Sequence, residues 1–158
     1  MTSTPPTASK SGGSRPVAFL AVTCVAGLAI WWGLRVAEQR ALEEALLPYA
    51  ETALPAPGAP VDAALADVGA RVFEARCTGC HAVRGQPKLG PNLAGITLAR
   101  DLPWIRSMVT NPDSMTRADP IARALLQAYG VPMQVVGGMD GSAARAVIEF
   151  LRRADGGV

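Results

Sequence analysis

The sequence predicts an all-α fold, with one long N-terminal helix followed by a small helical domain. Two segments of the C-terminal part repeat apolar residues at the three- and four-residue spacing of a helix face, and no alternating β-branched run predicts a strand pair. Between these segments, stretches rich in Gly, Pro and Asn are typical of loops. Ahead of the domain, residues 16–34 form a run without a charged residue.

Residues 1–37 are expected to form a tail and a membrane anchor. Residues 1–15 are small and polar and cannot bury enough apolar surface to fold, so we expect a disordered tail. The uncharged run has 19 residues, which at about 1.5 Å per residue matches the hydrocarbon thickness of a bilayer. A cleaved signal sequence is the alternative, but its apolar core is usually about 7 to 15 residues long and ends at an Ala-x-Ala site that this chain lacks. We therefore favour a transmembrane anchor over residues 16–37.

Single residues of the uncharged run support the anchor. Trp31 and Trp32 lie near its C-terminal end, where indole rings prefer the membrane interface. Cys24 lies in the middle of the run, so we expect a membrane-buried thiol and not a lipid-modified cysteine. Basic residues flank the run on both sides, so positive charge alone does not set its orientation.

Residues 38–61 connect the anchor to the domain. The helical pattern continues to Leu47, and residues 53–60 then bring three prolines and a glycine. Such a composition breaks a helix and predicts a partly extended, semi-rigid tether. We place the domain in residues 62–158, near the lower end of the sizes that bury a sufficient core unaided.

Two amphipathic helices are expected to bracket this domain. Asp62 is placed to cap the first, and either Asp140 or Ser142 is placed to cap the second. Each helix has one apolar stripe and would bury it against the rest of the domain. The stripes consist of Leu65, Val68, Gly69, Val72 and Phe73 in the first helix, and of Ala144, Val147, Ile148 and Leu151 in the second.

Two shorter helices and two loops are expected between them. Residues 102–109 follow a capping Asp101, and residues 120–129 follow a capping Asp119. Loops are where a cofactor pocket is usually lined. The expected loops, which are punctuated by Gly, Pro and Asn, are residues 84–93 and 110–117.

The pentapeptide Cys-Thr-Gly-Cys-His at residues 77–81 directly follows the first helix. Its spacing is that of a c-type haem site, in which two thiols, here Cys77 and Cys80, bond one porphyrin and the adjacent His81 ligates the iron. A structural zinc would need four ligands, but His81 is the single histidine and the remaining cysteine, Cys24, lies in the apolar run. A thioredoxin-like dithiol would follow a strand, and no strand pattern precedes the motif. We therefore expect one covalently attached haem c.

Charge and cysteine content exclude other classes of protein. The 15 Lys and Arg residues exceed the 13 Asp and Glu residues by only two, and the charges are scattered along the chain. No nucleic-acid partner is therefore indicated. With three cysteines, two of them in the haem motif, no structural disulfide is expected.

Residues 62–155 resemble the single-haem cytochrome c family, of the membrane-anchored bacterial kind. The resemblance implies that the first and last helices of the domain cross where Gly69 and Phe73 meet Phe150 and Leu151. Besides the haem motif, it rests on Gly90-Pro91-Asn92-Leu93, Thr110-Asn111-Pro112, Tyr129-Gly130-Val131-Pro132-Met133 and Val147-Ile148-Glu149-Phe150-Leu151.

The resemblance also assigns residues around the haem. The carbonyl of Pro91 is expected to accept a hydrogen bond from the His81 imidazole, which fixes the orientation of the ring. Trp104 is expected either to donate to a haem propionate or to pack in the core. Met133, in a loop, matches the distal iron ligand of the family, although Gln134 stands where many relatives have Pro.

Other methionines compete for the distal position. Met1 is excluded by its place in the chain, and Met108 lies on an expected helix, where core packing is favoured. Met115 and Met139 lie in expected loops and remain alternatives to Met133.

These residues predict electron transfer rather than enzyme activity. With His81 and Met133 as axial ligands, the iron would have no position open to a substrate. The resemblance implies haem attachment outside the bacterial cytoplasmic membrane, hence a single-pass protein with its haem domain in the periplasm. We expect integral membrane redox complexes or other cytochromes of a respiratory or photosynthetic membrane as donor and acceptor, and membrane lipid around the helix. A haem-based gas or redox sensor and a fixed haem subunit of a larger oxidoreductase are the alternatives.

Overall fold

The protein divides into two compact units, Met1–Arg40 and Ala41–Val158. The expected tail, residues 1–15, lies outside the described residues except for Arg15, which begins the first helix. Within the described part, every regular element is helical apart from one isolated bridge between Ala82 and Asn92. The computed structural model describes the backbone of residues 15–49, 53–135, 137 and 139–157, and the side chains of these residues from 24 onward.

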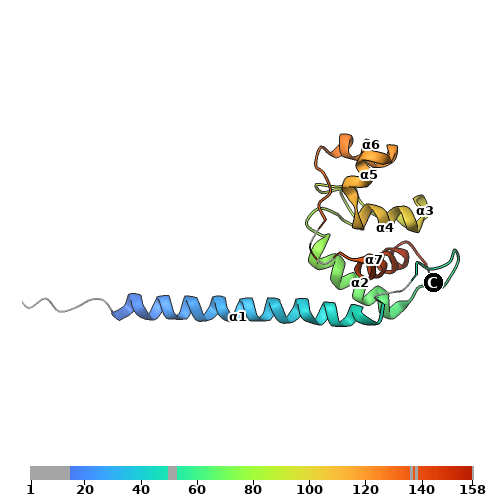
Figure 1. Cartoon of the computed structure of the whole chain (residues 1–158). Coiled ribbons are helices and arrows are strands. Elements are labelled where there is room, and N and C mark those ends of the chain that lie inside the picture. Colours follow the sequence, from blue (N-terminus) through green and yellow to red (C-terminus); the bar gives the residue numbers. More distant parts are fainter. Residues whose placement is uncertain (1–14, 50–52, 136, 138, 158) are drawn as a thin grey trace, which may run out of the picture. The chain divides into compact units, whose positions relative to one another are not determined.

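The first helix, α1 (Arg15–Leu46), is continuous over 32 residues and covers the expected anchor (Figure 1). The described side chains of the uncharged run are exposed, and Trp32 and Leu34 each expose 67% of their surface. The side chains of residues 15–23 lie outside the described part. Across the described residues, we find no helix that has both the length and the apolar character needed to cross a membrane.

In the second unit, α2 (Ala63–Arg76) and α7 (Gly141–Ala154) pack side by side (Figure 1). Asp62 caps α2 by accepting from the Leu65 N–H at 3.0 Å, and Asp140 caps α7 by accepting from the Ala143 N–H at 2.9 Å. Of the two caps considered for α7, the structure therefore has Asp140.

The α2–α7 crossing is close enough to require a glycine. A Cβ atom on Gly69 would lie 1.9 Å from the backbone oxygen of Ala146. Beside this contact, the rings of Phe73 and Phe150 pack with their centroids 5.1 Å apart. This is the crossing implied by the family resemblance.

The remaining helices form a lobe beside this pair. Asp101 caps α4 and Asp119 caps α6, as the sequence predicts, and Gly130 ends α6 at φ 69°. The expected loop at residues 110–117 is wrong, because Asn111 caps a further helix that begins at Pro112. Pro is favoured in the first helical turn, so Asn-Pro begins a helix here rather than a turn. The lobe comprises α3 (Ile96–Ala99), α4 (Leu102–Thr110), α5 (Pro112–Ala118) and α6 (Pro120–Tyr129).

The described residues 41–49 and 53–61, which we call the strap, belong to the second compact unit. Leu42 and Leu46 at the end of α1 are 4% and 6% exposed and join the core of α2 and α7. After the short 3₁₀ helix Leu47–Tyr49, the carbonyls of Ala53 and Ala59 accept hydrogen bonds from arginines of α7. The expected semi-rigid tether is therefore also bound to α7. The sequence did not indicate this, because these bonds link residues more than 90 positions apart and local composition does not encode them.

Candidate haem-binding site

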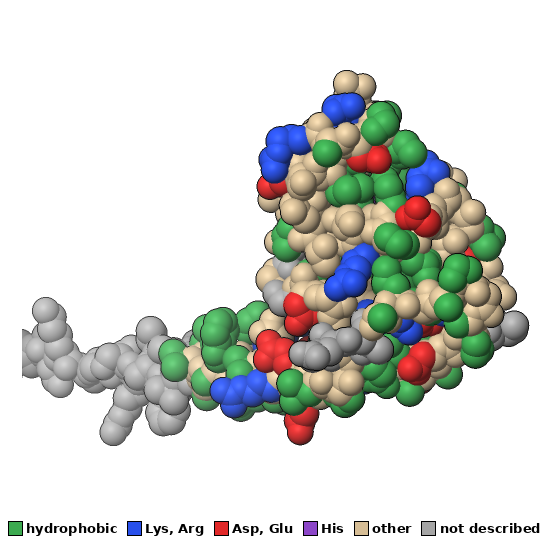
Figure 2. All heavy atoms as spheres, turned by 45° about the vertical axis from the view of Figure 1, so that its right-hand side comes forward, with side chains coloured by type: hydrophobic (Ala, Val, Ile, Leu, Met, Phe, Trp, Pro, Cys, Tyr) green, Lys and Arg blue, Asp and Glu red, His purple; other side chains and the backbone are tan. Residues whose placement is uncertain are grey.

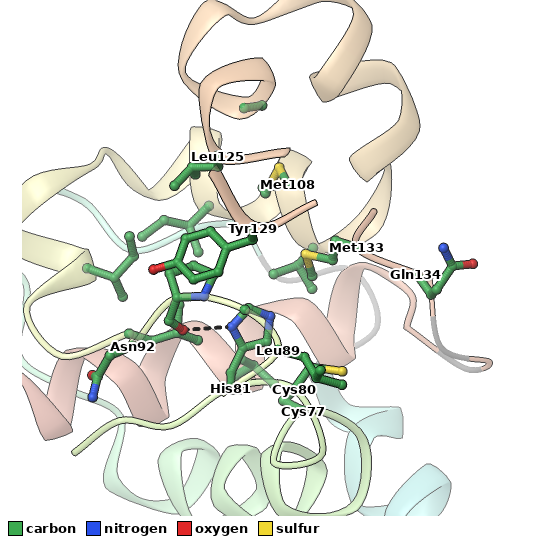
Figure 3. Close-up of a pocket in the computed structure, with 18 of the residues that line it drawn as sticks. Cys77, Cys80, His81, Leu89, Asn92, Met108, Leu125, Tyr129, Met133 and Gln134 are labelled. Carbon is green, nitrogen blue, oxygen red and sulfur yellow. Dashed lines mark hydrogen bonds between the residues drawn. The ribbon is translucent and has the colours of Figure 1, made fainter. Parts of the chain in front are cut away.

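A cavity of about 310 Å³ lies between the α2–α7 pair and the lobe. Its wall brings together the residues that the family resemblance assigns to the cofactor, and Figure 3 labels Cys77, Cys80, His81 and Met133 among them. Most of the lining is aliphatic or aromatic, and the two charged residues among the described lining are both arginines, Arg76 and Arg100. The predicted site residues on this wall are Cys77, Cys80, His81, Pro91, Trp104 and Met133.

The two thiols are positioned by the end of α2. The N–H of Cys77 donates to the Phe73 carbonyl at 2.8 Å and ends the helix, and the His81 N–H returns to the Cys77 carbonyl at 2.8 Å. The intervening turn presents Cys77 and Cys80 on the cavity wall as free thiols. Before the haem is attached, burial raises the pKa of the Cys77 thiol to about 11, so the unattached sulfur is protonated at neutral pH.

His81 is held in one orientation by a backbone carbonyl. Its Nδ1 lies 2.9 Å from the Pro91 oxygen (Figure 3, dashed line). A carbonyl oxygen only accepts, so Nδ1 carries the proton and donates. The Nε2 atom therefore keeps its lone pair and is the nitrogen able to ligate a metal.

Backbone hydrogen bonds on either side of Pro91 join its loop to the haem motif and to the residue directly after it. The Gly90 N–H donates to the Cys80 carbonyl at 2.9 Å, and the Leu93 N–H donates to the Ala82 carbonyl at 2.7 Å. A Cβ atom on Gly90 would lie 2.6 Å from Cε1 of the His81 ring, so this position leaves room only for glycine. The carbonyl of Pro91 is thereby fixed opposite the imidazole.

Trp104 and Arg100 form a polar group on the otherwise apolar wall. The indole Nε1 of Trp104 is buried and has no hydrogen-bond partner among the described residues. The guanidinium of Arg100 lies 5.6 Å from the centre of the indole ring. The indole is also close enough to Asp119 to help lower the pKa of that carboxyl, after the larger effect of the Ala122 N–H.

This polar group fits the anionic edge of a haem. A buried N–H without a partner is costly, and a propionate oxygen would satisfy it. The Asp119 carboxyl lies near enough to compete for this N–H, so donation to a propionate stays a prediction beside core packing. Sequence reasoning missed Arg100, although a basic residue four positions before a candidate propionate donor was a usable signal.

Three methionines lie on the cavity wall, namely Met108, Met133 and Met139. Figure 3 shows Met108 and Met133 above the His81 ring in this view. Met108 comes from α4, whereas Met133 comes from the segment after α6. Met115, expected in a loop, lies on α5 and is not among the described residues of the wall.

Fold and site together define a small helical protein that holds a covalent haem. A family model for cytochrome c matches residues 66–155, so this chain belongs to the cytochrome c family. Family membership makes haem c, attached through Cys77 and Cys80, its cofactor. The residues present fit this group, because the two cysteines, the oriented imidazole and the buried Trp104 indole line one cavity.

Solved structures agree with this assignment. A cytochrome c from Rhodothermus marinus is 34% identical, with 60% of this chain covering 80% of that one at a TM-score of 0.57. An engineered form from the same organism is 30% identical, with 72% of this chain covering 97% of that one at a TM-score of 0.60. A further structure of the engineered protein, described as bound to a carbene intermediate, has a TM-score of 0.58. Among curated proteins, the comparison finds no match.

Proposed function

We propose that this protein is a membrane-tethered one-electron carrier whose iron is ligated by His81 and Met133. The cytochrome c domain implies haem-based electron transfer. The observation that supports the two proposed iron ligands is the hydrogen bond between His81 and Pro91, which leaves Nε2 of His81 free to ligate the iron. The Met133 thioether lies on the wall of the same cavity. Two protein ligands close the iron to a substrate and favour electron transfer over catalysis.

When bound, the haem supplies a centre that gains and loses single electrons. The chain holds this centre in a fixed, dry position. Cys77 and Cys80 attach it, and the Pro91 carbonyl keeps the His81 ring from turning. The aliphatic and aromatic wall excludes water, and a thioether from Met133 favours the reduced iron.

The exposed apolar helix supports the proposed membrane anchor. In α1, Val25, Leu28 and Ile30 each expose 65% or more of their surface. Such a continuous apolar surface is unfavourable in water and favourable in lipid. We place the haem domain on the periplasmic side of the cytoplasmic membrane, because c-type haem is attached there in the family.

The charge of the domain supports docking by local contacts. Residues 62–158 contain 11 Arg and Lys and 9 Asp and Glu, a difference of +2, which two propionates would bring near zero. On the face in Figure 2, hydrophobic side chains of the domain are scattered among isolated basic and acidic groups. We therefore expect docking to membrane redox complexes or other cytochromes to depend only modestly on salt.

A fixed haem subunit of a larger oxidoreductase is the second candidate. The strap favours it, because a segment bound to the domain gives less freedom to move between partners than a free tether. A fixed subunit would purify in a stoichiometric complex, whereas a carrier would separate from its partners.

Stopped-flow reoxidation of the reduced full-length protein by native membranes tests the proposed function. We expect single-electron transfer on the timescale of membrane turnover. The control is carbon monoxide binding to the reduced protein, which should be slow because Met133 occupies the sixth position. Rapid carbon monoxide binding without electron transfer would favour a gas sensor instead.

A further inference from the structure

The polar face of α7 is buried as well as its apolar face. All eight residues from Ser142 to Glu149 are buried, whereas the sequence pattern predicts only one buried stripe. The apolar face packs on α2. The opposite face carries Arg145, Glu149 and Arg152, and the strap covers it.

Glu149 is the centre of this polar face. It is fully buried, and its carboxylate lies 2.9 Å from Nη2 of Arg145. Nη1 of Arg152 donates to both carboxylate oxygens, at 3.0 and 2.8 Å. The Asp62 N–H, at the end of the strap, also donates to Glu149 at 3.2 Å.

The two arginines also hold the strap. Arg145 donates to the carbonyl of Ala53, and Arg152 donates to the carbonyl of Ala59. At the C-terminal end of the strap, a Cβ atom on Gly157 would lie 2.9 Å from Cγ2 of Val61, so these two segments pack closely. The strap is thus fastened by buried charged groups at two points, in addition to the core contacts of Leu42 and Leu46.

We propose that Arg145, Glu149 and Arg152 form a latch that fastens the strap to α7. The electron-transfer domain then begins at residue 41, and the Pro-rich segment stays bound to it instead of serving as a free tether. The consequence of the latch for electron delivery rests on the proposed function. With the latch closed, the Pro-rich segment does not serve as a free spacer that would let the haem domain reach more distant partners.

The two fastenings are unequal. Arg152 has three acceptor atoms, two on Glu149 and one on Ala59. Arg145 is 8% exposed, yet its Nε is buried without a hydrogen-bond partner in the described structure. An unpaired buried donor weakens the arginine that carries it. The Arg152 fastening is therefore the stronger of the two.

Hydrogen exchange of the full-length holoprotein, measured by mass spectrometry, tests the latch. In Arg152→Ala, we expect the amides of Ala59, Val61 and Asp62 to exchange at least about a hundredfold faster, because one partner of a buried ion pair is lost. In Arg145→Ala, the increase should be smaller and should lie near Ala53. Amides of α5 and α6 serve as the internal reference and should not change.

Arg153→Ala is the matched control on the same helix. Arg153 pairs with Asp67 at 2.7 Å and with the Ala66 carbonyl, both on α2, and its side chain is 38% exposed. This variant should leave exchange in the strap unchanged. If Arg152→Ala fails to fold, Arg152→Lys keeps the charge but loses the forked donor and should give an intermediate increase.

The result separates the latch from the proposed function. Fast exchange of Ala59, Val61 and Asp62 in the wild-type protein, or equal exchange in Arg152→Ala and wild type, would overturn the latch and leave electron transfer untouched. A protected strap in a protein that transfers no electrons would overturn the function and leave the latch.

Discussion

The α2–α7 pair and the lobe of α3, α4, α5 and α6 are stabilised in different ways. Six residues of α2 and nine of α7 are buried, against one each in α4, α5 and α6 and none in α3. The pair packs protein atoms directly against protein atoms, with Gly69 at the Ala146 carbonyl. The lobe helices instead line the cavity.

This difference indicates that the haem supplies the core of the lobe. A small domain buries too little surface to stabilise every element by protein contacts alone. The haem would cover the apolar wall of the lobe, while the α2–α7 pair already has its core without it. Variants that remove either the haem or the direct packing of α2 on α7 should therefore affect the two regions separately.

The largest effect is expected when haem attachment is prevented. In Cys77→Ser combined with Cys80→Ser, the lobe should lose its protection from hydrogen exchange while α2 and α7 keep part of theirs. A tightly bound group stabilises the folded state by about 4 kcal/mol or more, so the unfolding free energy should fall by at least that amount. Mass spectrometry of the denatured protein verifies that the haem is absent. Equal protection of α4–α6 from hydrogen exchange with and without haem would contradict the claim that the lobe depends on the haem for its core.

The second largest effect is expected at the α2–α7 crossing. In Gly69→Val, the new side chain would meet the Ala146 carbonyl and push the helices apart, at a cost of about 3 kcal/mol. Urea unfolding of the holoprotein, followed by circular dichroism and haem absorbance together, measures this loss. Gly27→Ala is the control, because a Cβ atom there meets nothing within 4 Å. A loss in Gly69→Val no larger than in this control would show that the crossing is adaptable.

The sequence predicts the α2–α7 pair well because its signals are local. Asp62 and Asp140 precede apolar stripes of helical period, and these caps and stripes are present in the structure. The haem motif is equally local, since its five residues are contiguous. The contact of Gly69 with the last helix could be predicted only from the family resemblance, because a glycine within a helix does not indicate which segment packs against it.

The features that the sequence did not predict depend on distant partners. Asn111-Pro112 is typical of both a turn and a helix start, and only the structure shows that α5 follows. Arg145 and Arg152 resemble ordinary surface charges, and their burial depends on a strap about 90 residues away. The role of Trp104 likewise depends on where its buried indole N–H lies relative to Asp119 and the cavity, which no sequence pattern reports.

A third effect is expected on the reduction potential. Met133→Ala should remove the distal thioether and lower the potential on the order of 0.1–0.2 V, a fraction of the roughly 0.8 V that axial ligands span. Loss of the methionine-to-iron absorption band should accompany it, because the thioether no longer ligates the iron. Met108→Ala and Met139→Ala, on the same wall, are the controls and should leave both nearly intact. The reverse pattern would assign the distal ligand to one of them.

The smallest effect compares two helix caps of the same chemistry, one in each region. Asp140 caps α7 and Asp119 caps α6, and the pKa of each carboxyl lies below its usual value. For Asp119 the main cause of the lowered pKa is the Ala122 N–H. For Asp140 burial alone would raise the pKa, but the hydrogen bonds from Ala143 and Ser142 together outweigh it. A lowered folded-state pKa means that each carboxylate stabilises the fold above the unfolded value near about 3.9 and loses this effect as the pH falls through the folded value.

The two substitutions should therefore differ in where they act and agree in how they respond to pH. Asp140→Ala should lower the global unfolding free energy by about 1 kcal/mol at pH 7, because α7 belongs to the directly packed pair. Asp119→Ala should mainly speed hydrogen exchange in α6, because that helix depends on the haem for its core. Both differences from the wild type should shrink as the pH falls from about 4 through the lowered folded-state pKa values, where the folded wild-type carboxylates become protonated. Urea unfolding and hydrogen exchange of the holoproteins at pH 7 and at acid pH measure these effects. A global loss from Asp119→Ala equal to that from Asp140→Ala would show that the two regions unfold as one unit, and the haem would then stabilise both alike.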